Sequence, residues 1–387
     1  MLRSSVKPTS PSRDVDDSKQ PEKQWWKRSR FFFLRYGHCW ATATLALGSL
    51  LWVITRTGFR IGTTNSPSRD LSAPMGPIIY GTKNKGDRTA ALVEEAVSAG
   101  FRHIASASSH YTNYNEAGVG AGWTAAAMTP GGPSRKEMFL QTMFLSPSNP
   151  DWKPADAATK SMGVEDQVRA SLEKSLRDLR TDYVDCFLYH NLKNKLDPLE
   201  NVLRAWRIME SYVDAGTVRS LGITNVHDAL YFDQFYESVR IKPAVVQVRF
   251  HSNRQFGMPM RWKFRELGIV EQLFWILTGN GHAILHPATK AAAAECSLTP
   301  QQFIYGFILA MGAGKIHPLI GTTNRKHMEE DLEVAKYFDD AWPERKLFVD
   351  RWFGRVALKE FAGKVFRRPD LIAHLEDDKK KKDHPAS

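Results

Sequence analysis

The chain has 387 residues, 42% apolar and 25% charged, which is the composition of a globular protein rather than a disordered one. Its formal net charge is +11, but residues 1–36 carry nine Lys or Arg against four acidic residues, so that +5 lies in a short N-terminal tail. This uneven distribution argues against a nucleic-acid-binding protein. The three cysteines lie far apart without CxxC or Cys/His ligand spacing, so we expect neither a disulfide framework nor a metal site.

Residues 36–55 form a run of twenty residues without a formal charge, preceded by the basic tail 1–35. A helix of this length spans about 30 Å, the thickness of the hydrocarbon core of a bilayer. Trp40 and Trp52 fall near the two ends of the run, where amphipathic rings favour the membrane interface. The run therefore predicts a single transmembrane helix, and the alternatives are a signal peptide or a buried core helix.

The charges on the two sides of this run indicate its orientation. The fifteen residues before it carry five Lys or Arg, and the fifteen after it carry three. The positive-inside rule then places the N-terminus in the cytoplasm and the larger part of the chain in a lumen, so we expect a single-pass protein of the endomembrane system. Residues 56–76 are rich in Ser, Thr, Gly and Pro and predict a linker.

Eight short apolar runs follow the linker, and most are separated by amphipathic stretches with apolar residues three or four apart. The runs are 77–81, 101–105, 138–142, 183–190, 218–224, 244–250, 268–277 and 316–322. This alternation predicts a (β/α)8 TIM barrel over residues 77–345, followed by a C-terminal helix and a charged tail over residues 346–387. In such a barrel the functional residues lie at the carboxyl ends of the strands.

Two of the predicted strand ends are polar. The second run continues as RHIASASSHYTNYNEAGVG (102–120), which predicts a loop rich in Ser, His, Tyr and Asn at the barrel mouth. The fourth run ends at His190. A single histidine there can be structural, but its place at the end of an inward-facing strand favours a catalytic role.

A series of motifs resembles the aldo-keto reductase family, in the order of that family. The motifs are PIIYGT, GFRHI, YNEAGVG, LEKSLRDLRTDYVD, LYH, VDAGTVRSLGITN, IKPAVVQ and LIGTTNRKHMEEDL. The resemblance runs from about Pro77 to Phe338 and is closest to fungal-type members. It implies a (β/α)8 barrel and reversible, NADPH-dependent reduction of a carbonyl group.

The family motif has four catalytic positions, and two of them are substituted in this chain. Its aspartate corresponds to Ala105 and its lysine to Met143, whereas its histidine corresponds to His190. Its tyrosine corresponds to Tyr114, with Tyr111 as the alternative because the loop is one residue longer than usual. Loss of both charged residues leaves no unpaired buried charge, so we expect a stable fold with weakened or altered activity, in which Tyr114 or His190 donates the proton.

The cofactor-binding residues that the resemblance implies are present more completely than the catalytic residues. Thr224, Asn225 and Gln247 correspond to residues that hold the nicotinamide carboxamide, and Phe274, or alternatively Trp275, to an aromatic residue that stacks on the ring. The last strand and the following helix would bind the adenosine phosphate, and an ordinary capped helix is the alternative. The candidate residues there are Gly321, Thr322, Thr323, Asn324, Arg325 and His327. Arg325 and the adjacent Lys326 favour NADPH over NADH.

The sequence thus predicts a membrane-anchored, NADPH-dependent reductase. We expect its substrate to be a ketone or aldehyde on a small organic molecule, such as an intermediate of secondary metabolism. A second hypothesis is a catalytically degenerate barrel that binds a ligand without hydride transfer. A third is a lyase or isomerase that uses His190.

Overall fold

The computed structural model of the chain describes residues 75–108, 113–146, 148, 161–192, 197–338 and 353–373. The tail 1–35 and the predicted transmembrane segment 36–55 lie outside these residues, as does the alternative tyrosine, Tyr111. Within the described ranges, no helix combines the length and the apolar character needed to cross a membrane.

Eight parallel strands form a closed barrel in which neighbours in sequence are neighbours in space, and β1 closes the barrel by pairing with β8. The strands are β1 (Ile79–Gly81), β2 (His103–Ala105), β3 (Phe139–Leu145), β4 (Cys186–His190), β5 (Leu221–Thr224), β6 (Val245–Arg249), β7 (Val270–Phe274) and β8 (Ile316–Ile320). Each lies within or overlaps one of the eight predicted runs, so the predicted (β/α)8 fold is confirmed.

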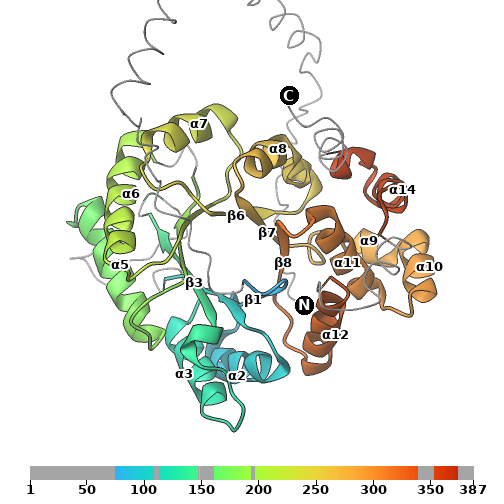
Figure 1. Cartoon of the computed structure of the whole chain (residues 1–387), viewed down its shortest axis with the longest axis horizontal. Helices are drawn as coiled ribbons and strands as arrows, with labels where there is room; N and C mark the ends of the chain where they lie inside the picture. The colour runs from blue at the N-terminus through green and yellow to red at the C-terminus, as the bar shows by residue number, and fades with distance from the viewer. Residues whose placement is uncertain are drawn as a thin grey trace, which may run out of the picture. The chain divides into compact units, whose positions relative to one another are not determined.

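Helices follow the strands and surround the barrel (Figure 1). The α-helices are α2 (Thr89–Ala99), α3 (Glu116–Ala127), α5 (Val164–Asp178), α6 (Leu199–Asp214), α7 (Ala229–Ser238), α8 (Met258–Glu266), α9 (Gly281–Leu285), α10 (Pro287–Glu295), α11 (Pro300–Gly312), α12 (Arg325–Lys336) and α14 (Arg355–Phe366). Short 3-10 helices are η1 (Gly86–Arg88), η2 (Arg135–Glu137), η3 (Ser252–Gly257) and η4 (Pro369–Ile372).

The strands are buried on both faces, which explains why they read as almost continuous apolar runs. Along β3, Phe139 and Met143 belong to a small cluster inside the barrel, whereas Leu140 and Phe144 belong to the larger core between the barrel and the helices. This alternation follows from the two-residue period of a strand. Residues at every second position therefore point into the barrel, and those nearest the carboxyl ends face its mouth.

The glycines of the YNEAGVGAG motif allow α3 to pack closely against its neighbours. A Cβ atom on Gly120 would lie 2.0 Å from the carbonyl oxygen of Asp178, and one on Gly122 would lie 2.3 Å from that of Ala90. Asn115 begins the helix by accepting a hydrogen bond from the Gly118 N–H at 2.8 Å. The motif thus fixes the helix that follows the polar loop of β2.

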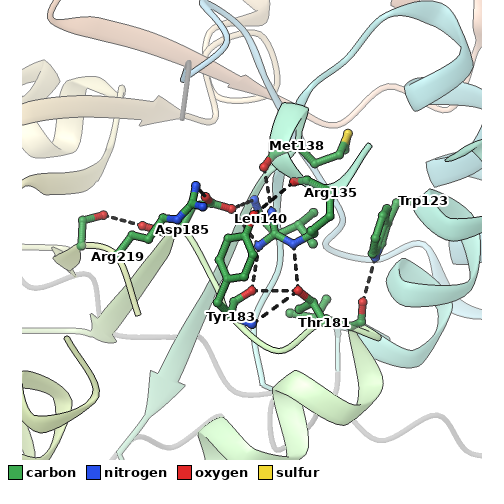
Figure 2. Close-up of polar contacts among 10 residues, drawn as sticks. Trp123, Arg135, Met138, Leu140, Thr181, Tyr183, Asp185 and Arg219 are labelled. Atoms are coloured by element: carbon green, nitrogen blue, oxygen red, sulfur yellow. Dashed lines mark hydrogen bonds and ion pairs between the residues drawn. The ribbon is translucent and has the colours of Figure 1, made fainter. Parts of the chain in front are cut away.

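The amino end of β4, opposite the mouth, is held by a buried carboxylate (Figure 2). Asp185 forms ion pairs at 2.9 Å with both Arg135 and Arg219, and it accepts the Leu140 N–H at 2.9 Å. The Tyr183 ring lies against both guanidinium groups, at 3.8 Å and 4.1 Å from its centroid. This cluster joins the amino ends of β3, β4 and β5 and is a structural feature.

Candidate active site

The carboxyl ends of all eight strands surround a cavity of about 730 Å³. This is where a (β/α)8 barrel carries its functional residues. Seven of the predicted site residues line the cavity, and they come from six different strand ends or the loops that follow them. These residues are Tyr114, His190, Asn225, Gln247, Phe274, Gly321 and Thr323.

Both substituted catalytic positions face the same cavity. Ala105 and Met143 line it, with 3% and 2% of their surfaces exposed. Tyr114 packs against the inner cluster that contains Met143, and His190 lies nearby at the end of β4, next to β3. Two apolar side chains thus stand at the positions of the motif's aspartate and lysine, in the cavity that Tyr114 and His190 also line.

Three strands are each followed directly by a residue with left-handed backbone conformation. Asn191 (φ 64°), Asn225 (φ 55°) and Trp275 (φ 65°) directly follow β4, β5 and β7. Asparagine tolerates this conformation, whereas a bulky residue such as tryptophan is strained in it. Strain of this kind concentrates at ligand sites, and all three residues line the cavity.

Thr224 does not line the cavity, although the resemblance implies a contact with the carboxamide. Its side chain is fully buried, and its Oγ1 accepts hydrogen bonds from the Asn191 N–H at 2.9 Å and the Asn225 Nδ2 at 3.3 Å. The Asn225 Nδ2 also donates to the Asn191 Oδ1 at 2.6 Å. Thr224 therefore positions Asn225, and the Oδ1 of Asn225, which accepts no hydrogen bond from the part of the chain that the structure describes, can accept one from a ligand.

Gln247 is held by a chain of amides inside the barrel. Its Nε2 donates to the Gln272 Oε1 at 3.1 Å. Gln272 and Gln141 exchange two further hydrogen bonds, at 2.7 Å and 2.9 Å. Gln247 lines the cavity, and no described residue donates a hydrogen bond to its Oε1, which can therefore accept an N–H group of a carboxamide. Sequence reasoning missed Gln141 and Gln272, whose signal is a glutamine at an inward position of an apolar strand.

Phe274 and Trp275 both line the cavity, so both remain candidates for the ring-stacking residue. Trp275 is 45% exposed and Phe274 is half-buried. The guanidinium carbon of Arg249 lies 4.2 Å from the centroid of the Trp275 ring and 5.7 Å from that of Phe274. Arg249 was also missed from the sequence, although it lies two residues beyond Gln247 on the same face of β6.

The predicted adenosine-phosphate residues are only partly brought to the cavity. Asn324 caps α12 by accepting the Lys326 N–H at 2.9 Å, as an ordinary capped helix requires. Arg325 pairs with Glu329 at 2.7 Å and donates to the carbonyl oxygen of Glu95 at 3.0 Å. The residues of this group that do not line the cavity are Thr322, Asn324, Arg325 and His327. Their contact with a phosphate stays a prediction.

Lys85 is a further residue of the mouth that the sequence reasoning did not single out. It lines the cavity with only 8% of its surface exposed, and its Nζ donates a hydrogen bond to the Gly321 carbonyl oxygen. Burial, aided by the nearby Arg88, lowers the pKa of Lys85 to about 8. The side chain is therefore still mainly charged at neutral pH, and it ties the loop after β1 to the end of β8.

Comparisons with known proteins agree with this architecture. Residues 77–259 match the model of the aldo/keto reductase family. The chain is similar to the NAD(P)H-dependent D-xylose reductase of Candida tenuis, with 26% identity over 304 residues that cover 65% of this chain and 87% of the relative. It is also similar to the NAD/NADP-dependent indole-3-acetaldehyde reductase of Schizosaccharomyces pombe, with 29% identity over 286 residues, 69% of this chain and 90% of the relative.

Solved structures show the same fold. An aldo/keto reductase from Brucella melitensis aligns with a TM-score of 0.55 and 21% identity, covering 71% of this chain and 94% of that one. A Bombyx mori aldo-keto reductase in complex with NADP aligns with a TM-score of 0.54 and 22% identity, covering 73% of this chain and 88% of that one. The resemblance found in the sequence motifs is therefore confirmed, including its similarity to fungal sugar and aldehyde reductases.

Proposed function

We propose that this chain, which belongs to the aldo-keto reductase family, uses NADPH to reduce a ketone or aldehyde on a small organic molecule. The observation that carries the proposal is that His190, Tyr114, Asn225, Gln247 and Phe274 line one cavity at the carboxyl ends of the strands. The curated relatives named above are NAD(P)H-dependent reductases of a sugar and an aldehyde, which supports this reaction class. Intermediates of secondary metabolism are among the substrates that we propose to screen.

The cavity residues fit a nicotinamide cofactor. When bound, NADPH supplies a hydride to the carbonyl carbon and leaves as NADP⁺. In the proposal, the open oxygens of Asn225 and Gln247 accept the carboxamide N–H groups, and the ring of Phe274 or Trp275 covers one face of the nicotinamide. The electron pair of the carbonyl double bond moves to its oxygen, which takes a proton from Tyr114 or His190.

The two substitutions explain why we expect slow turnover. An unperturbed tyrosine has a pKa near 10, and a neighbouring ammonium group would favour its ionised form. Met143 carries no charge and Ala105 no carboxylate, so this assistance is absent from the apolar wall beside Tyr114. Proton transfer by a positioned side chain contributes about 10²- to 10⁴-fold, so a weaker donor slows the reduction within that range.

The same apolar wall favours a second candidate, a degenerate barrel that binds a nucleotide or another small molecule without reducing it. The cavity and the amide chain below Gln247 would then serve binding alone. Turnover separates the two candidates. Oxidation of NADPH in the presence of aldehydes, with one alcohol formed for each NADPH consumed, supports the reductase, and binding without consumption supports the degenerate barrel.

Cofactor binding is tested by fluorescence titration of the full-length chain with NADPH. We expect a micromolar Kd, and a Gln247→Leu variant should bind at least about tenfold more weakly because a hydrogen bond to the carboxamide is lost. Gln234→Leu, which changes an exposed glutamine on α7, is the matched control and should bind like the parent chain. Absence of NADPH binding to the parent chain would refute the proposal.

We also propose that residues 36–55 anchor the protein in an endomembrane. The support is the uncharged run and the charge bias around it. The full chain should stay with microsomes after alkaline carbonate extraction, whereas a variant without residues 1–56 should be released. Protease protection of the barrel in intact microsomes then reports the side on which it lies, and cleavage of the barrel would contradict a lumenal position.

A further inference from the structure

The charged side chains that line the cavity are all positive. Four Lys or Arg side chains line it, and no Asp or Glu of the described residues does. The basic residues are Lys83, Lys85, Arg249 and Arg254, with His190 and His227 in addition. A cleft of this kind concentrates the positive potential and attracts anions.

Arg249 is the member of this set whose contacts most require a ligand. Its Nε atom is buried and has no hydrogen-bond partner among the described residues, and none of their carboxylates pairs with its guanidinium group. The flat group rests instead on the ring of Trp275, at 4.2 Å from its centroid. A buried donor without a partner destabilises the fold unless a ligand satisfies it.

Two other arginines that lie wholly or partly inside the protein contrast with Arg249. Arg261 is 1% exposed and pairs with Glu271 at 3.3 Å, and Arg135 pairs with the buried Asp185 at 2.9 Å. Glu271 lies on β7, and Asp185 lies directly before β4. Arg249 is left without one at the mouth of the barrel, with its planar donor group beside the cavity. Such a group recognises carboxylates and phosphates through two parallel hydrogen bonds.

The place of Arg249 favours the substrate over the cofactor as the source of this anion. Arg249 lies next to Phe274 and Trp275, the candidates for the nicotinamide face, and two residues from Gln247. The predicted adenosine-phosphate end lies at β8, where Lys85 contacts Gly321. An anion on Arg249 would thus lie beside the proposed nicotinamide site and not at the β8 end.

We propose that Arg249 binds an anionic group, a carboxylate or a phosphate, on the small-molecule ligand of this cavity. The inference rests on the proposed function in one respect: if the chain is a reductase, that ligand is its carbonyl substrate. Trp275 supports the guanidinium from one side through the face of its ring. Arg254 adds a second positive charge to the same cavity.

The test uses two matched pairs of compounds with the full-length chain in a mild detergent. For turnover, 4-carboxybenzaldehyde is compared with its methyl ester at a fixed NADPH concentration. For binding, 4-methylbenzoate is compared with its methyl ester by isothermal titration calorimetry in the presence of NADP⁺. A charge-assisted hydrogen bond predicts that the acid is favoured at least about tenfold in kcat/KM and in Kd.

Three variants test whether Arg249 causes the preference for the acid. Arg249→Gln should reduce the preference for the acid to about one, and Arg249→Lys should restore part of it. Arg240→Gln is the charge-matched control, because Arg240 is exposed, pairs with Asp214 at 2.6 Å and does not line the cavity. This control should keep the full preference for the acid.

The outcomes separate the inference from the proposed function. Equal binding of acid and ester to the parent chain would overturn the inference. So would an Arg249→Gln variant that loses at least tenfold in NADPH affinity while its acid preference is unchanged, since the anion would then belong to the cofactor. Arg249-dependent binding of 4-methylbenzoate without turnover of any aldehyde would uphold the anion site and refute only the reductase.

Discussion

The backbone N–H of Asn191 donates a hydrogen bond to the Oγ1 of Thr224 at 2.9 Å, which joins the ends of β4 and β5 at the barrel mouth. Thr224→Val keeps the shape of the side chain but leaves this buried N–H without a partner. We expect the free energy of unfolding to fall by about 1–3 kcal/mol and NADPH binding to weaken severalfold, because Asn225 loses its support. Urea denaturation and fluorescence titration measure the two effects.

Thr224→Ser is the control for this change, because it keeps the hydroxyl group. It should retain most of the stability and the NADPH affinity of the parent chain. A serine variant that binds NADPH as weakly as the valine variant would show that the hydroxyl is not what positions Asn225.

Introducing the aspartate and the lysine of the family motif into the cavity wall should increase activity. Ala105→Asp together with Met143→Lys places a carboxylate and an ammonium group beside Tyr114, where the ammonium favours the ionised tyrosine. We expect at least about a tenfold gain in kcat with a generic aldehyde. Met143→Lys alone should destabilise the fold by about 3 kcal/mol, because the charge is buried without a partner.

The double variant should recover part of that loss of stability, so a double-mutant cycle of unfolding free energies accompanies the kinetics. A double variant that is stable but turns over aldehydes no faster than the parent would indicate that the cavity does other chemistry.

Glu116 should make the fold less stable as the pH rises. It is fully buried, and burial raises its pKa from 4.5 to about 7, although hydrogen bonds from Thr142 and Ser175 act in the opposite direction. Between pH 4.5 and 7 the unfolded state loses this proton before the folded state does. Stability that is present below pH 4.5 is therefore lost up to pH 7, by about 3 kcal/mol in total.

Glu116→Gln should flatten this dependence, as measured by urea denaturation at pH 5 and pH 8. Asp331, whose pKa burial raises to about 8, remains in the variant and leaves a residual slope of the same sign. Glu94→Gln, on the exposed face of α2, should not change the difference between the two pH values. The account of Glu116 is wrong if its variant also leaves that difference unchanged.

The ion pairs of Asp185 should stabilise the barrel strongly (Figure 2). Asp185→Asn removes a carboxylate that is 1% exposed, and two arginines lose their partner. We expect a loss of about 3 kcal/mol in the free energy of unfolding, at the low end of the range for buried pairs because both arginines are partly exposed.

Asp214→Asn is the matched control, since Asp214 and Arg240 form an exposed pair. It should cost less than about 1 kcal/mol in urea denaturation. NADPH binding should be unchanged in both variants, because Asp185 lies at the amino end of β4 and the cavity at the carboxyl end. Similar losses in the two variants would contradict a special role for the buried cluster.

The sequence by itself determined the barrel, the eight strands and the strand ends at which the site lies. Hydrophobic periodicity is a local property of the chain, and a run buried on both faces is recognisable without knowing its neighbours. The resemblance to the family motif assigned Ala105, Met143, Tyr114 and His190 to one site, and all four line the cavity.

Only the tertiary structure decided which side chains meet across the barrel. Lys85 and Gly321 are 236 residues apart, and Gln141 and Gln272 are 131 residues apart, yet each pair is hydrogen-bonded. Arg249 and Trp275 come from neighbouring strand ends, and neither residue reveals in the sequence that the other will support it. Such contacts depend on the register of the strands and on the closure of the sheet, which no local pattern encodes.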